Sequence, residues 1–459
     1  MTSSPLASLT GAMFSTAAMQ EAFSAAACVQ GMLDFEAALA RAEARTGVIP
    51  VAAAAPIAAC CTAARIDLAS LATAAGSAGN LAIPLVKQLT AAVAAEDKEA
   101  AKFVHWGATS QDAIDTGMVL QLRVALDLID ADLAQLADAL ARQAEQHRNT
   151  PVVGRTWMQH ALPVTFGLKV ASWLDAVMRH QERMQALRAR VLVVQFGGAA
   201  GTLASLGEQG VKVSIALAEE LNLTLPDTPW HTQRDRMVEV ATVLGMLTGT
   251  LGKMARDISL HMQTDVAEVA EPVAEGRGGS STMPHKRNPV GCAATLTAAM
   301  RLPALVSTML SGMVQEHERA LGGWQAEWDT LPEIAQLAAG ALQQMRQVAS
   351  GLTVDTARMR ANLDITHGQI MAEAVTLALG GKIGRLAAHQ MVEAACHSAS
   401  KSGIHLREML ALNPAITAEL CSDELDRLVD PSNYLGQAAA FVDRVLETHR
   451  RKADVQTGN

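Results

Sequence analysis

The residues best suited to chemistry lie in one short segment, 278–289, which reads GGSSTMPHKRNP. Glycines let a backbone turn its N–H groups toward a ligand, Ser280 and Ser281 add hydroxyl groups, and Lys286 adds a positive charge. Together these groups suit a carboxylate or an enolate-like oxyanion. Asn288, followed by a proline, is typical of a helix N-cap, so we expect a helix N-terminus that also favours anions.

Two other interpretations of this segment follow from its composition. A surface loop with a capping asparagine contains the same residue types, and short motifs give false positives. A nucleotide-binding P-loop is disfavoured, because no strand-like run precedes the glycines and the pattern GxxxxGKS/T is absent. An enzyme is therefore the first hypothesis.

Residues 279–289 resemble the signature GSSxMPxKxNP of the fumarase/aspartase superfamily. Two further segments resemble blocks of that superfamily and occur in the expected order: residues 105–116 (HWGATSQDAIDT) and 154–163 (GRTWMQHALP). The resemblance therefore spans most of the chain. It implies an all-α fold with an elongated central bundle of long helices between two smaller helical domains. It also implies a homotetramer whose active sites draw residues from three subunits.

The resemblance assigns roles within the signature segment. In the superfamily a serine of this loop removes a proton alpha to a carboxylate, and Ser280 matches that base by position. A serine hydroxyl is a weak base at neutral pH, so it needs nearby donors and positive charge, which Lys286 and the loop N–H groups are expected to supply. Ser281 is a helper or an alternative base. Ser281, Lys286 and Asn288 are expected to contact the substrate.

Other matching positions are expected to bind substrate carboxylates: His105, Thr109, Ser110, Thr156 and Gln159. The spacing from Thr109 to Asp112 also resembles a capping box, so part of the first block has a structural alternative. Arg234 is expected to bring charge to a polyanionic substrate, with a salt link to Asp235 as the alternative. His160 is expected to orient the substrate or relay a proton, and a core histidine is the alternative.

One departure from the superfamily pattern is informative. Lyases of this superfamily carry a histidine where this chain has Trp157, and a glutamate that pairs with it where this chain has Ala293. That dyad handles protons at the leaving group, which amines and hydroxide require. A carboxylate, with a pKa of about 4, leaves without a proton. Trp157 is then expected to pack against the substrate and exclude water, and a space-filling role in a degenerate site is the alternative.

The implied reaction is reversible addition of a carboxylate to a conjugated alkene acid, as in the superfamily's lactonising cycloisomerases of aromatic-acid catabolism. Residues 229–236 (PWHTQRDR) are also similar to those members. The implied substrate is a small tricarboxylate, Ser280 is the acid in the lactonising direction, and no metal or organic cofactor is expected. The alternatives are an adenylosuccinate lyase-like C–N lyase, which lacks support because the dyad is absent, and a non-catalytic protein recruited from a lyase.

Composition excludes several other classes of protein. The 459 residues are 50% hydrophobic and carry a net charge of −9, which argues for a large core and against a nucleic-acid surface. The six cysteines have no CxxC spacing, so we expect reduced buried thiols rather than a metal site. No signal peptide or bilayer-spanning apolar run is recognised, so we expect a cytoplasmic protein without a membrane partner.

Helical periodicity indicates the elements that position these residues. Apolar residues recur every three or four positions between Asp112 and His147, which predicts a long helix with a packed seam. Further long helical runs are predicted at 163–195, 232–271, 289–320 and 332–350. Glycines and prolines break the C-terminal part at 380–381, 403, 414 and 431. We therefore predict domains at 1–110, 111–351 and 352–459.

Overall fold

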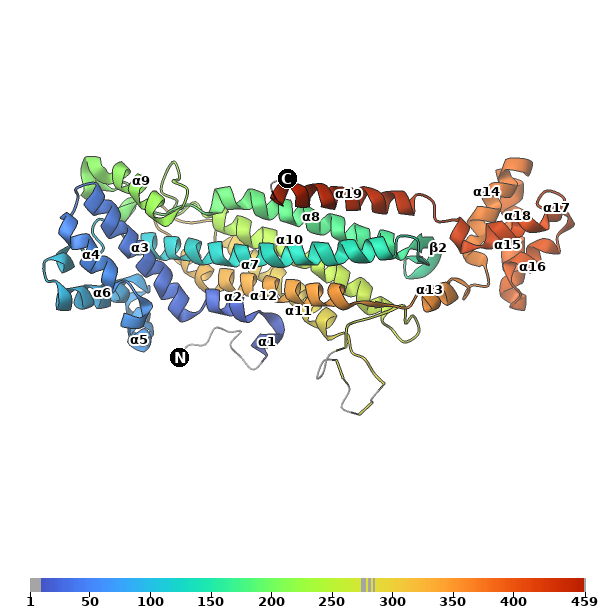
Figure 1. Cartoon of the computed structure of the whole chain (residues 1–459), viewed down its shortest axis with the longest axis horizontal. Coiled ribbons are helices and arrows are strands. Elements are labelled where there is room, and N and C mark those ends of the chain that lie inside the picture. The colour runs from blue at the N-terminus through green and yellow to red at the C-terminus, as the bar shows by residue number, and fades with distance from the viewer. Residues whose placement is uncertain (1–9, 274–277, 280–281, 284, 458–459) are drawn as a thin grey trace. The chain divides into compact units, whose positions relative to one another are not determined.

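The computed structural model describes residues 10–273, 278–279, 282–283 and 285–457. The fold is all-α, with small β-sheets only, in the part of the chain so described. The predicted long runs are confirmed as helices α7 (Ser110–Gln146), α8 (Phe166–Val191), α10 (Asp235–His261), α11 (Val290–Ser311) and α12 (Gly323–Gly351), which Figure 1 labels. Helix α12 begins nine residues before the predicted start and contains Pro332 in its interior.

Backbone contacts divide the chain into two compact units. Unit 1 comprises residues 1–134, 179–253 and 293–345, and unit 2 comprises residues 135–178, 254–292 and 346–459. The predicted boundaries near 110 and 352 coincide with the start of α7 and the end of α12. The division into three domains stays a prediction.

The N-terminal part of unit 1 is built around helix α3 (Ala25–Arg45), which packs against α4 (Val51–Cys60) and α9 (Gly210–Leu221) (Figure 1). This part also contains α1 (Gly11–Phe14), α2 (Ala17–Ala22), α5 (Leu68–Ala78) and α6 (Ala82–Glu96). Helix α3 ends at Arg45, Gly47 has a φ of 77°, and Pro50 precedes α4. The apolar side chains on the inward face of α3 are fully buried, with Met32, Leu33, Phe35 and Leu39 at most 1% exposed.

Two glycines allow α3 and α7 to cross at very short range. A Cβ atom added to Gly31 would lie 2.8 Å from the carbonyl oxygen of Gly117. A Cβ atom added to Gly117 would lie 3.0 Å from the backbone nitrogen of Met32. Backbone atoms cannot rotate away as side chains do, so the crossing requires glycine on both helices.

Unit 2 contains a β-hairpin that the sequence analysis did not predict. Strands β1 (Pro151–Thr156) and β2 (Gln159–Thr165) pair antiparallel, with an irregular register between Val153 and Arg155. Helix α8 begins at Phe166, so the prediction that Pro163 starts this helix is wrong. A second small sheet pairs β3 (Val269–Ala270) with β4 (Thr353–Val354).

The C-terminal part of unit 2 is a cluster of shorter helices: α13 (Thr356–Leu363), α14 (Ala372–Ile383), α15 (Arg385–Ser402), α16 (Leu406–Ala411), α17 (Pro414–Thr417), α18 (Ser422–Val429) and α19 (Ala438–Thr457). Breaks at Gly403, Pro414 and Pro431 are confirmed, since each of these residues lies at the start or end of a helix. The break predicted at 380–381 is wrong, because α14 continues to Ile383 and ends at Gly384, whose φ is 90°.

The glycine crossing gives a stability prediction. We expect Gly31→Ala to lower the free energy of unfolding by about 1–3 kcal/mol, because the added methyl group forces the two backbones apart. Gly76→Ala is the matched control, since Gly76 lies exposed in the last turn of α5 with nothing within 4 Å of a Cβ atom. Alanine there stabilises by up to about 1 kcal/mol. Thermal unfolding followed by circular dichroism measures both, and equal melting temperatures for the two variants would contradict the prediction.

Candidate functional site

The first predicted block opens helix α7. Thr109 precedes the helix, Ser110 is its first residue, and a carboxylate oxygen of Asp112 accepts a hydrogen bond from the backbone N–H of Thr109 at 3.0 Å. The capping alternative for this spacing is therefore correct for the Asp112 side chain. The Thr109 hydroxyl does not take part in that cap.

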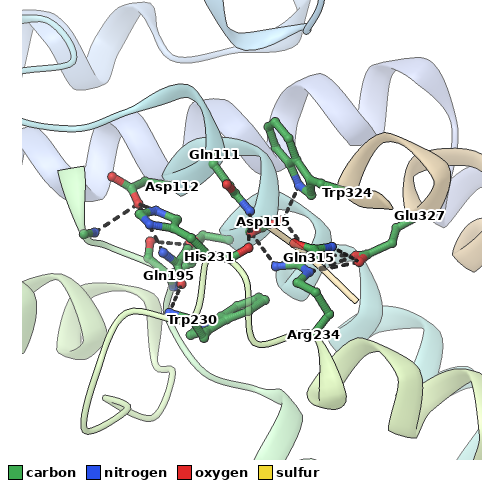
Figure 2. A network of polar contacts seen from close by, with 12 residues as sticks. Gln111, Asp112, Asp115, Gln195, Trp230, His231, Arg234, Gln315, Trp324 and Glu327 are labelled. Carbon is green, nitrogen blue, oxygen red and sulfur yellow. Dashed lines mark hydrogen bonds and ion pairs between the residues drawn. The ribbon is translucent and has the colours of Figure 1, made fainter. Parts of the chain in front are cut away.

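Asp112 also fixes two other segments of unit 1 to the start of α7. Its carboxylate is fully buried and accepts from the backbone N–H groups of Gly197 at 3.0 Å and Gly198 at 2.9 Å. The ring Nε2 of His231 lies 2.8 Å from the same carboxylate (Figure 2). Several donors around one buried carboxylate compensate for the loss of its hydration.

Arg234 belongs to an adjoining buried network (Figure 2). Its guanidinium is 2–3% exposed and pairs with the carboxylates of Asp115 at 2.8 Å and Glu327 at 2.6 Å. The indole N–H of Trp324 donates to Asp115 at 2.9 Å. Burial opposes the charge on Arg234, but the two carboxylates outweigh it and raise the pKa of this arginine above its usual value.

The substrate role expected for Arg234 stays a prediction. Its guanidinium donates to protein carboxylates on both sides, so it has a structural role in unit 1. The alternative salt link to Asp235 is wrong, because the partners lie 119 and 93 residues away along the chain.

A different arginine, Arg319, contacts the first block. It lies in the exposed segment between α11 and α12 and donates to the hydroxyl oxygen of Thr109 at 3.1 Å. It also donates to the side-chain oxygen of Gln111 at 3.3 Å and the carbonyl oxygen of Ala199 at 3.2 Å. These partners are neutral, in contrast to the carboxylates around Arg234. The sequence analysis missed Arg319, because no motif marks its segment.

His105 stands on a constrained backbone before α7. Its φ is 57°, and that of Gly107 is 71°, where a Cβ atom would lie 2.6 Å from the Leu206 side chain. The ring Nδ1 lies 2.5 Å from a carboxylate oxygen of Glu36 on α3. Burial alone lowers the pKa of His105, but the Glu36 carboxylate outweighs burial and raises it above its usual value.

The second block forms the tip of the hairpin in unit 2. Thr156 pairs with Gln159, so Trp157 and Met158 form a two-residue turn, with φ values of 52° and 64°. Such turns favour Asn-Gly, since a bulky side chain at positive φ is strained. Both side chains are exposed, Trp157 by 97% and Met158 by 71%. A strained and exposed apolar tip is typical of a functional element.

Buried Glu268 anchors this hairpin through Arg155 of strand β1. Its carboxylate accepts two hydrogen bonds from the Arg155 guanidinium, at 2.7 and 3.0 Å, and one from Asn362 at 2.7 Å. The ring Nδ1 of His261 lies 2.5 Å away. Burial would raise the pKa of Glu268, but these donors outweigh burial and lower it to about 2.

His160 lies on the side of the hairpin that faces this cluster. It pairs with Arg155, one position from the Thr156–Gln159 pair, and neighbouring positions of a strand point to opposite faces. Its Nδ1 is buried and has no hydrogen-bond partner among the described residues. Burial, followed by the Arg155 charge, lowers the pKa of His160, so the ring is neutral at pH 7. A proton-relay role for His160 stays a prediction.

The signature segment is described only in part, and Ser280 and Ser281 lie outside the described residues. Lys286 is exposed. The backbone N–H of Asn288 donates to the carbonyl oxygen of Gly278 at 2.9 Å, which joins the two ends of the segment. Gly278 has a φ of 69°, and a Cβ atom there would lie 2.9 Å from the carbonyl oxygen of Asn288, so glycine is required.

The N-terminus of α11 is already capped by protein. The carboxylate of Glu271 accepts from the backbone N–H groups of Gly291 at 3.0 Å and Cys292 at 2.8 Å. Helix α11 begins at Val290, two residues after Asn288. Asn288 is therefore not the N-cap residue that the sequence predicted. The expectation that this helix terminus binds a substrate anion is corrected, since a protein carboxylate occupies it.

The candidate residues fall into both units. Unit 1 contains His105, Thr109, Ser110 and Arg234, and unit 2 contains Thr156, Trp157, Gln159, His160, Lys286 and Asn288. Within the described ranges, no group of three or more histidine, cysteine, aspartate or glutamate side chains is arranged to hold a metal ion.

Glu268 gives a prediction about acid stability. Its pKa of about 2 lies below the usual 4.5, so its stabilising contribution is complete above pH 4.5 and is lost as the pH falls toward 2. We expect Glu268→Gln to cost about 3 kcal/mol at pH 7, because Arg155 loses its buried counter-charge, and to flatten the acid dependence. Melting temperatures at pH 7, 5 and 3 test this, with exposed Glu447→Gln as control. Parallel pH profiles for wild type and Glu268→Gln would contradict it.

Comparison with known proteins identifies the family. A family model described as Lyase matches residues 13–303, and one described as Adenylosuccinate lyase C-terminus matches residues 368–445.

The chain is 58% identical to 3-carboxy-cis,cis-muconate cycloisomerase of Pseudomonas aeruginosa, over 98% of both chains. It is 54% identical to the enzyme of that name from Bradyrhizobium diazoefficiens, over 98% of this chain and 100% of the other. The crystal structure of 3-carboxy-cis,cis-muconate lactonizing enzyme from Pseudomonas putida superposes with a TM-score of 0.93 at 56% identity, covering 96% of this chain and 99% of the other. The chain therefore belongs to the lyase family of the fumarase/aspartase superfamily that its motifs resemble.

Proposed function

We propose that this chain is a cycloisomerase that converts 3-carboxy-cis,cis-muconate to 4-carboxymuconolactone in aromatic-acid catabolism. One observation carries the proposal beyond family membership. Trp157, at the strained tip of the hairpin, stands where C–N lyases of the superfamily carry the histidine of their leaving-group dyad, and Ala293 stands in place of the paired glutamate. Lactone opening releases a carboxylate, which needs no proton from such a dyad. The two relatives named 3-carboxy-cis,cis-muconate cycloisomerase, which match over nearly their whole length, support the same substrate for this chain.

The reaction assigns a task to each group. One substrate carboxylate attacks the conjugated diene, so that a C–O bond forms, a π bond breaks, and negative charge moves onto a second carboxylate as an enolate. Ser280 delivers a proton to the alpha carbon of that enolate, and the reverse reaction uses the same serine as base. Lys286 and the loop N–H groups stabilise the developing oxyanion. Trp157 covers the substrate and excludes water, while Thr156 and Gln159 hydrogen-bond to a substrate carboxylate.

Arg319 adds a cation to the candidate substrate-binding residues of unit 1. With His105, Thr109 and Ser110 it forms a cluster of donors at the start of α7, and its described partners are neutral oxygen atoms. Its charge is therefore not balanced by a protein carboxylate and remains for a substrate carboxylate. A chain with a net charge of −9 needs local cations of this kind to hold a tricarboxylate.

The active enzyme is proposed to be a cytoplasmic homotetramer with shared active sites. Helix α11 is apolar and long enough to cross a membrane by composition, with Arg301 in its interior. Only 33% of its most apolar window is buried within the chain, so much of its apolar surface is exposed. In unit 1 its exposed side carries Met300, exposed by 79%, and Leu310, exposed by 49%. Packing against other copies of the chain would cover this face, as is usual for long helical bundles.

The two alternatives make distinct claims. An adenylosuccinate lyase-like enzyme would need the dyad that Trp157 and Ala293 replace. A non-catalytic recruited protein would have no reason to keep the complete signature segment. Neither alternative is favoured by the two relatives described above, whose names describe cycloisomerases.

Turnover tests the function directly. We expect the purified protein to remove the conjugated-diene absorbance of 3-carboxy-cis,cis-muconate and to leave adenylosuccinate unchanged. Ser280→Ala should lower kcat by about 10²–10⁴-fold, because the proton donor is removed, with little change in melting temperature. A variant that retained kcat within about threefold of wild type would remove Ser280 from the mechanism. Cleavage of adenylosuccinate, or no turnover of the muconate by wild type, would reject the proposed function.

The two arginines should separate binding from stability. Arg319→Gln should raise KM about 10- to 100-fold at nearly unchanged melting temperature, because it removes a charge-assisted hydrogen bond to substrate. Arg234→Gln should instead lower the melting temperature, because Asp115 and Glu327 lose their buried counter-charge. Exposed Lys212→Gln controls for the loss of one positive charge in unit 1. An unchanged KM in Arg319→Gln would exclude Arg319 from substrate binding.

A further inference from the structure

Helix α3 carries two buried carboxyl groups that the proposed mechanism does not use. Glu36 is 2% exposed and Glu43 is fully buried. They are seven residues apart, so both lie on the same face of the helix, two turns from one another. Acidic side chains are rarely buried without a partner, which makes both positions informative.

Only Glu36 has a cationic partner. One of its carboxylate oxygens lies 2.5 Å from Nδ1 of His105, and the other has no hydrogen-bond partner among the described residues. Both oxygens of Glu43 lack such a partner. Burial, together with the nearby Glu36 charge, raises the pKa of Glu43 to about 9, so Glu43 is a neutral acid at pH 7.

The contact with Glu36 determines which nitrogen of His105 carries a proton. A carboxylate accepts hydrogen bonds, so Nδ1 must be the donor toward it. The opposite nitrogen, Nε2, has no protein partner among the described residues, and the side chain is 16% exposed. When the ring is charged, Nε2 offers an N–H to a ligand beside Thr109 and Ser110.

The charges around the ring favour its protonated form. Glu36 faces it from α3, and Asp112 acts on it from α7. The thiol of Cys61 lies near Glu36, but burial raises the pKa of that thiol, so it stays neutral. Besides burial, the groups that shift the pKa of His105 are the two carboxylates of Glu36 and Asp112.

We propose that Glu36 is a positioning residue that holds His105 as an imidazolium, with its Nε2–H directed at a substrate carboxylate. The inference rests on the proposed function in one respect, which is that the anion is a carboxylate of the substrate. The buried carboxylate replaces the hydration of the imidazolium and keeps its ring in one orientation.

The first experiment measures the protonation state of His105 and does not depend on enzymatic turnover. Diethyl pyrocarbonate modifies only the neutral imidazole, and peptide mass spectrometry follows the modification of His105 in the full-length protein between pH 5.5 and 8.5. We expect Glu36→Gln to increase the rate at His105 at least about tenfold at pH 7, because the ring loses its counter-charge. Glu43→Gln is the matched control, since it replaces a neutral acid with a neutral amide on the same helix. Its rate should equal that of wild type, and equal rates for Glu36→Gln and wild type would overturn the proposal.

The second experiment links the protonation to substrate. With 3-carboxy-cis,cis-muconate, Glu36→Gln should raise KM about tenfold with kcat within about threefold, and its KM should begin to rise at a lower pH than in wild type. In a His105→Gln background, Glu36→Gln should have no further effect on KM, because Glu36 acts through the ring. An additive effect in that background would show a merely structural role and overturn the proposal. If Glu36→Gln does not fold, Glu36→Asp replaces it, and unchanged His105 reactivity and KM in that variant overturn the proposal.

The two arms separate the possible failures. If wild type does not turn over the muconate, the proposed function fails, and the diethyl pyrocarbonate arm still tests the Glu36–His105 pair. If wild type is active and the His105 reactivity changes while KM does not, the proposed contact with the substrate carboxylate is wrong.

Discussion

The buried carboxylate of Asp112 is the interaction on which the candidate site of unit 1 depends. It sits in the first turn of α7 and accepts hydrogen bonds from Thr109, from the backbone of residues 197–198, and from His231. A buried charge tolerates little change in the number or direction of its donors, because each lost hydrogen bond leaves it partly desolvated. The segments that carry the candidate substrate-binding groups are therefore fixed to one helix terminus rather than left as independent loops.

Unit 2 uses the same principle with different residues. Glu268 holds Arg155 at the base of the hairpin, and Glu271 caps α11 just after the signature segment. Trp157, which is proposed to meet substrate, lies at the tip of this hairpin on strained backbone, with a φ of 52°. The hydrogen bonds of the buried carboxylate thus stabilise the hairpin, and this stabilisation offsets the strain of the backbone at its tip.

Local sequence signals predicted what depends on neighbouring residues. Periodicity predicted the long helices, and glycine and proline marked most of the helix ends. The hairpin was missed because its strands are short and contain prolines, and because Trp157 and Met158 form the turn in place of Asn-Gly. Partner identity was missed where the partner is distant, as for Arg234, whose carboxylates lie 119 and 93 residues away. Arg319 was missed for the same reason, since its contact with Thr109 spans 210 residues.

The distribution of charge relates the chemistry to the fold. Arg234 and Arg155 are neutralised by buried carboxylates and hold the structure, whereas Arg319 faces neutral oxygens and Lys286 is exposed. A reaction that expels a carboxylate needs cations to bind and stabilise anions, but it needs no acid at the leaving group. Absence of the dyad at Trp157 and Ala293, together with cations that have no carboxylate partner among the described residues, is the combination such a reaction requires. A C–N lyase that releases an amine would require the histidine and glutamate of the dyad, because an amine leaves only after it has been protonated.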